Sequence, residues 1–187
     1  EIGKELEKSK KEQNIYEKLI VAFGKNGIQA LIIENVLPEI EEEANDLLAK
    51  LTNNSTQISI ESLRDLKSGR MKETLDIKIS DELGTRDYEM YSGGESFRID
   101  FSLRIALSKL LTRRAGTKLR TLVMDEGFGT QDEEGIDNLV QAIQSISEDF
   151  DKILVITHLE SLKDVFPVRI EVTKLPEIGS RFEIVKN

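Results

Sequence analysis

The chain contains two short apolar runs that end in polar, chemically active side chains, Leu122-Val123-Met124-Asp125-Glu126 and Ile153-Leu154-Val155-Ile156-Thr157-His158. A helical pattern lies between them, from about Glu133 to Ser147. The order strand, helix, strand predicts parallel pairing. Because parallel strands end at the same edge of a sheet, Asp125, Glu126 and His158 are expected together, where α/β proteins bind ligands. We therefore expect an α/β fold with a mixed, partly parallel sheet and flanking helices.

The rest of the sequence divides into a leading helix and one lobe. Residues 1–23 are rich in lysine and glutamate, and they fit both the end of a coiled-coil helix and a solvated surface helix. Residues 24–187 are expected to form a single lobe. Its patterns predict a helix over 28–51, strands near 58–60 and 75–79, a long helix after Gly94 that stops at Gly116, a strand over Leu119–Met124, a short helix over Leu159–Val165, and strands over Val168–Thr173 and Arg181–Val185.

Composition excludes several classes of protein. The 187 residues carry a formal net charge of −9, one histidine and no cysteine. These counts exclude disulfides, cysteine nucleophiles and multi-histidine metal sites, and the charge argues against a protein that coats nucleic acid. The longest unbroken apolar run is five residues, Leu19–Phe23, so we expect no membrane span and a cytoplasmic protein. The chain begins at Glu1 without an initiator methionine, and we expect it to be an excised fragment.

A turn before the long helix has the features of an anion site. It reads Ser92-Gly93-Gly94-Glu95. Two glycines let a backbone approach a ligand closely, and the first amides of a helix attract negative charge. The same residues also fit a plain turn with a helix cap.

The strand-end acids suggest phosphate chemistry. Asp125 can hold Mg²⁺ through oxygen, and Glu126 can orient or deprotonate a water that attacks a phosphate. His158 can contact a phosphate or position the water. Each residue also has an ordinary structural interpretation: a strand-end acidic pair, a structural histidine and, for Asp132, a helix N-cap.

In their order along the chain, these motifs resemble those of an ABC-type ATPase. Ser92 to Glu95 resemble the signature motif, Asp125-Glu126 the Walker B motif, Asp132 the D-loop and His158 the H-loop. The long helix after the signature, together with Asp125-Glu126-Gly127-Phe128-Gly129-Thr130, is similar to the SMC-like SbcC-type ATPases of DNA double-strand-break repair. The resemblance implies that Glu126 and His158 are catalytic, that Asp125 supports Mg²⁺, and that Ser92, Gly93, Gly94, Glu95 and Asp132 contact ATP or link two active sites.

A P-loop is missing from the sequence. None of the 12 glycines begins a G-x-x-x-x-G-K-[ST] motif. The resemblance implies that an N-terminal P-loop lobe completes the head, that residues 1–23 are the returning coil, and that two heads form a homodimer on ATP. It also implies an SbcD/Mre-type nuclease partner, DNA, and a place near the nucleoid of a prokaryote.

Three residues depart from the family pattern: Tyr91 where leucine is usual, Gly127 where transporters have proline, and Gln131 where leucine is commoner. Alternatives therefore remain, namely the head of a chromosome-condensation SMC protein, another ABC-type ATPase, or a dimerisation module without turnover.

A basic run offers a second possible contact. Residues 101–124 contain six basic residues and no acid, namely Arg104, Lys109, Arg113, Arg114, Lys118 and Arg120. They fit DNA binding, but also favourable charges at a helix C-terminus. Arg104 resembles a family arginine that links nucleotide to lobe rotation, and it also fits an ion pair at the edge of the core.

Overall fold

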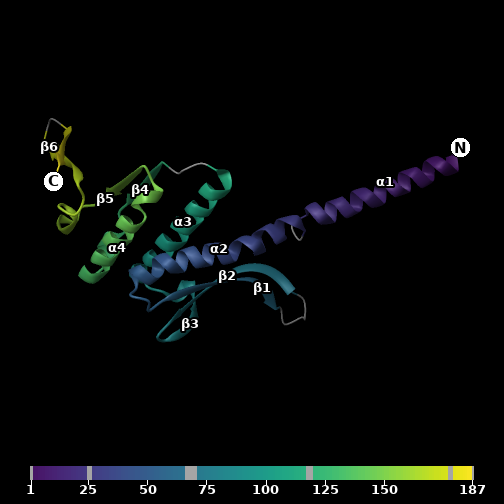
Figure 1. The fold of residues 1–187 in the computed structure, drawn as a ribbon, viewed down its shortest axis with the longest axis horizontal. Coiled ribbons are helices and arrows are strands. Elements are labelled where there is room, and N and C mark those ends of the chain that lie inside the picture. The colour runs from purple at the N-terminus through teal and green to yellow at the C-terminus, as the bar shows by residue number, and fades with distance from the viewer. Residues whose placement is uncertain (1, 25–26, 66–70, 117–119, 177–178, 187) are drawn as a thin grey trace.

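The computed structural model describes residues 2–24, 27–65, 71–116, 120–176 and 179–186. A long helix, α1 (Ile2–Phe23), projects from a body that is built around two further helices, α2 (Ile28–Leu51) and α3 (Gly93–Ala115). Figure 1 shows α1 reaching far from this body, with the chain's two ends on opposite sides. None of the residues of α1 is buried, whereas α2 buries five and α3 six. The body of the molecule therefore begins at α2.

Helices α2 and α3 each contribute to two hydrophobic cores. One core joins them to a three-stranded antiparallel sheet, which consists of β1 (Gln57–Asp65), β2 (Met71–Asp81) and β3 (Gly84–Asp87) in that order. Ile58 and Ile79 are paired across β1 and β2 and are fully buried there. The side-chain amide of Asn45 on α2 both donates to and accepts from the backbone of Ile58, which covers an edge strand that would otherwise be open to pairing.

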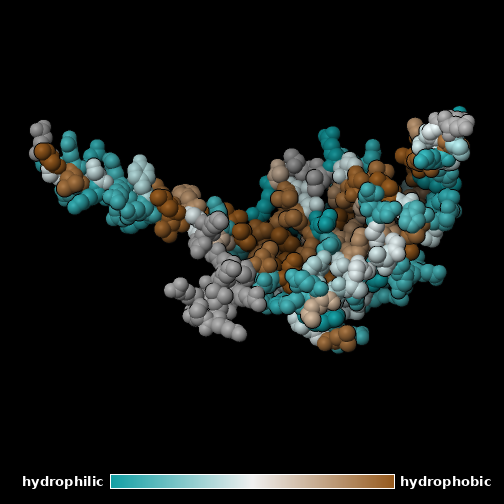
Figure 2. Space-filling model, turned by 180° about the vertical axis from the view of Figure 1, so that it is seen from behind, coloured by the Kyte–Doolittle hydropathy of each residue, from teal (hydrophilic) through white to brown (hydrophobic). Residues whose placement is uncertain are grey.

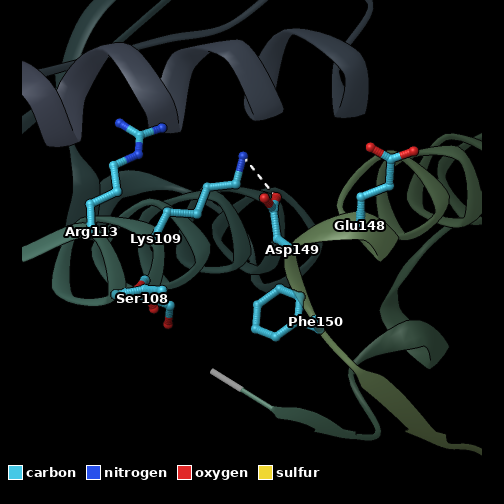
Figure 3. A pocket seen from close by; sticks show the side chains of 7 residues that line it. Ser108, Lys109, Arg113, Glu148, Asp149 and Phe150 are labelled. Carbon is cyan, nitrogen blue, oxygen red and sulfur yellow. Dashed lines mark hydrogen bonds and ion pairs between the residues drawn. The ribbon is translucent and has the colours of Figure 1, made fainter. Parts of the chain in front are cut away.

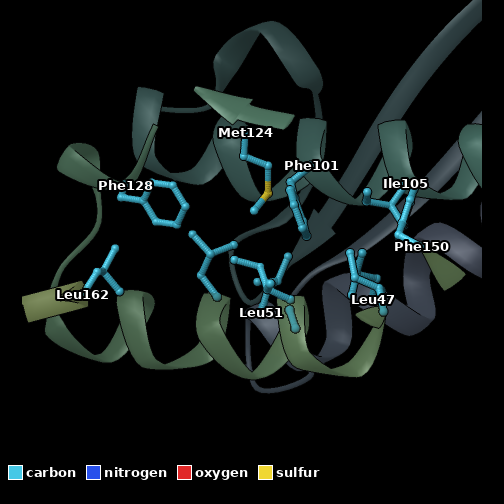
Figure 4. Packing of buried hydrophobic residues seen from close by; sticks show 12 residues of the cluster. Leu47, Leu51, Phe101, Ile105, Met124, Phe128, Phe150 and Leu162 are labelled. Atoms are coloured by element: carbon cyan, nitrogen blue, oxygen red, sulfur yellow. The ribbon is translucent and has the colours of Figure 1, made fainter. Parts of the chain in front are cut away.

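The second core lies on the other side of the same helices. It contains residues from α2, α3, β4 (Thr121–Asp125), α4 (Glu133–Ser145) and the segments around them. Figure 4 shows Phe101, Met124 and Phe128 packed above Leu51 and Leu162. Burial of each such side chain contributes about 1.5–3 kcal/mol, so this core holds the region of the predicted motifs against α2 and α3.

The predicted parallel pairing is confirmed. β4 pairs in parallel with β5 (Lys152–Ile156), and α4 connects them. The remaining strands, β6 (Val168–Leu175) and β7 (Gly179–Lys186), form an antiparallel hairpin. The fold is thus mixed α/β and partly parallel as expected, but within the described residues its strands form three small sheets.

Most predicted elements are present, with shifts at their ends. α3 begins at Gly93 and stops at Gly116, whose φ of 64° only glycine adopts readily. The helix predicted over Leu159–Val165 is wrong, because only a 3-10 turn, Glu160–Leu162, forms there. β3 was not predicted, since a four-residue strand gives too short a pattern to recognise.

The region around the join of α1 and α2 is apolar over more residues than the five-residue run Leu19–Phe23. By length and composition, one window within Ile2–Leu51 is apolar enough to cross a membrane. α1 ends at Phe23 and α2 begins at Ile28, however, so two helices share the window. Figure 2 shows apolar side chains gathered near this join and over the adjoining face of the body.

Candidate functional site

The carboxyl ends of β4 and β5 bring two predicted catalytic side chains together. Asp125 is paired with Ile156, and the next residue, Glu126, donates its N–H to the carbonyl oxygen of Ile156 over 3.0 Å. Oε1 of Glu126 lies 3.2 Å from Nδ1 of His158. Both side chains are mostly exposed, so together they present a carboxylate and an imidazole to solvent at one edge of the sheet.

The backbone of Glu126 is in the left-handed region, with a φ of 60°. This conformation costs a non-glycine residue about 1–2 kcal/mol, and such strain concentrates at functional sites. Gly127 follows with a φ of 98°, and a Cβ at that position would lie 2.1 Å from the ring of Phe97 on α3. The sharp turn after β4 therefore depends on glycine and is packed directly against the helix that follows the predicted signature motif.

Asp125 lies at the end of β4 with its side chain exposed. Within the described ranges, no three His, Asp or Glu side chains come together as a metal site. The carboxylate of Asp125 remains chemically suited to support Mg²⁺ through water and phosphate oxygens.

The N-terminus of α3 is organised by a reciprocal cap. The carboxylate of Glu95 accepts hydrogen bonds from the backbone N–H of Ser92 over 3.1 Å and from its hydroxyl over 2.6 Å. The hydrogen bond from the Ser92 hydroxyl, followed by that from its backbone N–H, holds the pKa of Glu95 below its usual value. A Cβ at Gly93 would meet nothing within 4 Å, so a ligand can approach the backbone of this turn.

Tyr91 fastens this turn to the three-stranded sheet. Its hydroxyl donates to Oδ2 of Asp81 over 2.8 Å, and the guanidinium of Arg86 stacks 4.4 Å from its ring centroid while also pairing with Asp81. The hydrogen bond from Tyr91, opposed by burial and supported by Arg86, lowers the pKa of Asp81. Leucine is usual at this position in the resembled family, and a leucine could make neither polar contact, so the tyrosine has a local structural reason.

The predicted D-loop contacts the predicted signature turn. Asp132 is the N-cap of α4 and accepts from the N–H of Gly135 over 2.9 Å. Arg98 on α3 donates to Asp132 and to the side chain of Gln131, which in turn donates to the carbonyl oxygen of Gly94. No motif in the sequence singles out Arg98, and Gln131 stands out there only as a departure from the family pattern.

The basic run is largely engaged inside the fold. On α3, Lys109 pairs with Glu43 over 3.4 Å and with Asp149 over 3.0 Å, and Arg113 pairs with Glu39 and Glu43. Figure 3 shows Lys109 and Arg113 extending from α3 toward α2, with Asp149 beside Lys109. The spacing of these residues in the sequence indicates such ion pairs. Glu39 and Glu43 lie i,i+4 on one face of α2, and Lys109 and Arg113 lie i,i+4 on one face of α3.

The other members of the run differ in their environments. Arg114 lies 3.8 Å from Glu39, and Arg120 lies 4.0 Å from Asp151. Lys118 is outside the described residues. Arg104 is exposed and has no ion pair with any residue that the structure describes, so the predicted ion pair at the edge of the core is not found there. Three members of the run, Lys109, Arg113 and Arg114, thus form ion pairs between α3 and α2.

Comparisons with known proteins relate the chain to SbcC. Residues 68–145 match the family model described as SbcC/RAD50-like, Walker B motif. The chain is 32% identical over 162 residues to the SbcC subunit of the nuclease SbcCD from Lactococcus lactis. The aligned residues make up 84% of this chain and 15% of that protein. It is 31% identical over 176 residues to the corresponding nuclease subunit from Staphylococcus haemolyticus, with coverage of 90% and 17%. The chain therefore spans about a sixth of these relatives.

Solved SMC proteins share the fold. A chain described under "Structural biochemistry of ATP-driven dimerization and DNA stimulated activation of SMC ATPases" superposes with a TM-score of 0.67 at 15% identity, over 84% of this chain and 89% of that one. The Smc head domain of Pyrococcus furiosus, with an extended coiled coil and bound to the C-terminal domain of ScpA, gives 0.68 at 15% identity over 97% and 44%. The chain is thus similar in sequence to part of the SbcC nuclease subunits, matches the SbcC/RAD50-like Walker B model over residues 68–145, and has the fold of an SMC head domain.

Proposed function

We propose that this chain is the C-terminal half of an ATP-hydrolysing head that dimerises on ATP and drives a nuclease complex in DNA double-strand-break repair. The observation that carries the proposal is the Glu126–His158 pair, 3.2 Å apart at the carboxyl edge of the parallel strands. A carboxylate in this position can act as general base toward water, and a neighbouring imidazole can orient the water or contact a phosphate.

The other predicted residues complete this assignment. When bound, Mg²⁺–ATP would supply the electrophilic phosphate and the metal that neutralises its charge. Asp125 would support the metal, Glu126 would accept the proton of the attacking water, and His158 would hold the phosphate or water in place. Ser92, Gly93, Gly94 and Glu95 would face the nucleotide that the opposite head holds, and Asp132 would link the two sites across the dimer.

The capped turn of α3 suits a reversible contact with an anion. The hydroxyl of Ser92 donates its proton to Glu95, and a phosphate oxygen would compete with that carboxylate for the same proton. The backbone of Gly93 is open to approach, and the helix N-terminus favours negative charge. The turn is therefore ordered before the nucleotide arrives, which reduces the entropy lost on binding.

An N-terminal P-loop lobe of the same protein is the partner that this head requires. Parallel sheets are normally covered on both faces. On the outer face of β4–β5, however, Val123, Leu154 and Ile156 are each between 39% and 53% exposed. One face of the β6–β7 hairpin is also apolar and exposed, with Val168, Ile170, Val172, Phe182 and Ile184. The missing P-loop and these uncovered faces support a second lobe that binds here.

The remaining partners follow from the relatives. The relatives are named as one subunit of the nuclease SbcCD, which supports an SbcD-type nuclease as partner, with DNA as the substrate of the complex and the nucleoid region of the cytoplasm as its place of action. α1 is exposed along its length, which supports a coiled-coil arm of residues 1–23 that pairs with another helix, while residues 24–187 form the lobe.

A chromosome-condensation head is the second candidate, because the structural matches are SMC heads. The sequence matches favour the nuclease complex instead. Purification of the full-length protein from cells separates the two: an associated SbcD-type nuclease supports the first, and a ScpA-like partner supports the second.

The direct test is substitution of Glu126 in the full-length ATPase. Glu126→Gln keeps the size and removes the base, so ATP binding should persist while turnover falls by about 10²–10⁴-fold and the ATP-bound dimer lasts longer. Ser92→Arg, which places a bulky cation at the interface, should block dimerisation. Unchanged turnover and association in both variants would refute the assignment of the site.

A further inference from the structure

The side-chain amide of Gln131 connects two loops that are far apart in the sequence. Nε2 of Gln131 donates to the carbonyl oxygen of Gly94 over 2.9 Å and to Oγ1 of Thr130 over 3.2 Å. Oε1 of Gln131 accepts from Nε of Arg98 over 2.6 Å. Both N–H hydrogens and the oxygen of the Gln131 amide are therefore used in hydrogen bonds. If the amide were rotated by 180°, its NH₂ group would face the guanidinium of Arg98, and two donors would oppose each other.

Arg98 extends this connection to the next residue of the loop. Its Nη2 donates to Oδ1 of Asp132 over 3.3 Å, while its Nε holds Gln131. Oδ1 of Asp132 also accepts the N–H of Gly135 in the first turn of α4. Arg98 and Gln131 thus tie the first turns of α3 and α4 to each other.

Two glycines make room for these contacts. A Cβ at Gly94 would lie 2.7 Å from the carbonyl oxygen of Thr130. A Cβ at Gly135 would lie 2.5 Å from Nη2 of Arg98 and 2.6 Å from Oδ1 of Asp132. The carbonyl oxygen of Thr130 belongs to the backbone, so the two loops can meet at this distance only because residue 94 is glycine, whereas a side chain at position 135 would displace the ends of the Arg98 and Asp132 side chains.

We propose that Gln131 is a positioning residue that holds the Ser92–Glu95 turn and Asp132 as one rigid unit, so that both engage the opposite head together. The inference rests on the proposed function, because it concerns how the same site is presented to a second head. With Gln131 in place, the α3 turn and Asp132 need no further ordering when the two heads close, and preorganisation of this kind strengthens association. Without it, each loop must be ordered separately.

The test uses the full-length ATPase with Gln131→Leu, which keeps the size of the side chain and removes its hydrogen bonds. We expect ATP-dependent dimerisation to weaken by about tenfold and kcat to fall with it, because the partly buried carbonyl oxygen of Gly94 and the guanidinium of Arg98 lose their hydrogen bonds. KM for ATP should change by less than about twofold, since the ATP-binding P-loop lies in the other lobe. The matched control is Gln141→Leu on the exposed face of α4, whose side chain has no hydrogen bond with the residues that the structure describes.

A second variant keeps the proposal testable if Gln131→Leu does not fold. Gln131→Glu retains an acceptor for Arg98 but turns a carboxylate toward the carbonyl oxygen of Gly94, so it should weaken dimerisation in the same way. Thermal unfolding identifies which variant is folded. A folded Gln131 variant with the dimerisation and kcat of the parent protein would overturn the inference.

The two proposals fail in different ways. If Glu126→Gln abolishes turnover while the Gln131 variants behave like the parent, only the positioning role is wrong. If Glu126→Gln also leaves turnover unchanged, the proposed function itself is wrong.

Discussion

Gly127 is the residue on which the turn after β4 depends. Its φ of 98° lies in the region that side chains rarely adopt, and the ring of Phe97 fills the space that a Cβ would need. Phe97 in turn packs with Phe101 and Phe128 at centroid distances of 6.4 and 6.3 Å. The position of Glu126 is therefore coupled to the aromatic packing of α3.

Gly127→Ala should destabilise the protein by about 2–3 kcal/mol, because it combines backbone strain with a clash in the core. The matched control is Gly129→Ala two residues later, where a Cβ meets nothing within 4 Å, and its effect should stay within about 0.5 kcal/mol. Urea denaturation followed by circular dichroism measures both changes. Equal stability of the two variants would show that the Gly127–Phe97 contact does not constrain the turn.

At the scale of elements, ion pairs join α2 to α3. Glu43 accepts from Lys109 and Arg113, and its side chain is only 20% exposed. Partial burial raises the pKa of Glu43, but the hydrogen bond from Arg113 and the charges of Lys109 and Arg113 outweigh it and hold the pKa below the ordinary value of 4.5. The ion pairs therefore stabilise the fold above that pH, and their contribution disappears as the pH falls through the lowered pKa.

Glu43→Gln should lower the free energy of unfolding at pH 7 by about 1–3 kcal/mol, since charged hydrogen bonds are lost from a partly buried site. The difference from the parent protein should shrink as the pH falls below 4.5, because the parent carboxylate becomes protonated too. Glu42→Gln, on the exposed side of the same helix turn, serves as the control with little effect. A destabilisation that persists unchanged at pH 3 would contradict the electrostatic explanation.

Sequence patterns predicted the long elements well and the connections poorly. The stripes of α2 and α3 and the apolar runs of β4 and β5 are long or strong enough to recognise, and the order of β4, α4 and β5 located Glu126 and His158 at one edge. The contact of Gln131 with Gly94 spans 37 positions and leaves no periodic signal. The separation of the β1–β3 sheet from the β4–β5 pair also depends on packing into two clusters that share α2 and α3, which no local pattern records.

For the whole molecule, the distribution of charge bears on DNA binding. Arg113 and Arg114 form ion pairs with α2, so they have fewer free charges to offer a phosphate backbone than the sequence suggested. In the full-length protein, the double variant Arg113→Gln, Arg114→Gln should reduce stability and leave the salt dependence of DNA affinity nearly unchanged. A true phosphate contact would lower the slope of log K against log salt by about 0.9 per residue, and a drop of about two would restore the DNA interpretation.

The outer face of β4–β5 gives the sharpest test of the proposed N-terminal lobe. Val123 and Met124 are neighbours on β4 that point to opposite faces, one 53% and the other 9% exposed. Val123→Asp should change the stability of this chain by no more than about 0.5 kcal/mol, as surface substitutions usually do, whereas Met124→Asp buries an unpaired carboxylate and should unfold it. The two lobes can be produced as separate chains and purified together. If the N-terminal lobe covers the outer face, Val123→Asp in this chain should abolish both the co-purification of the two lobes and their ATP turnover. Normal association of a folded Val123→Asp chain would show that the second lobe binds elsewhere.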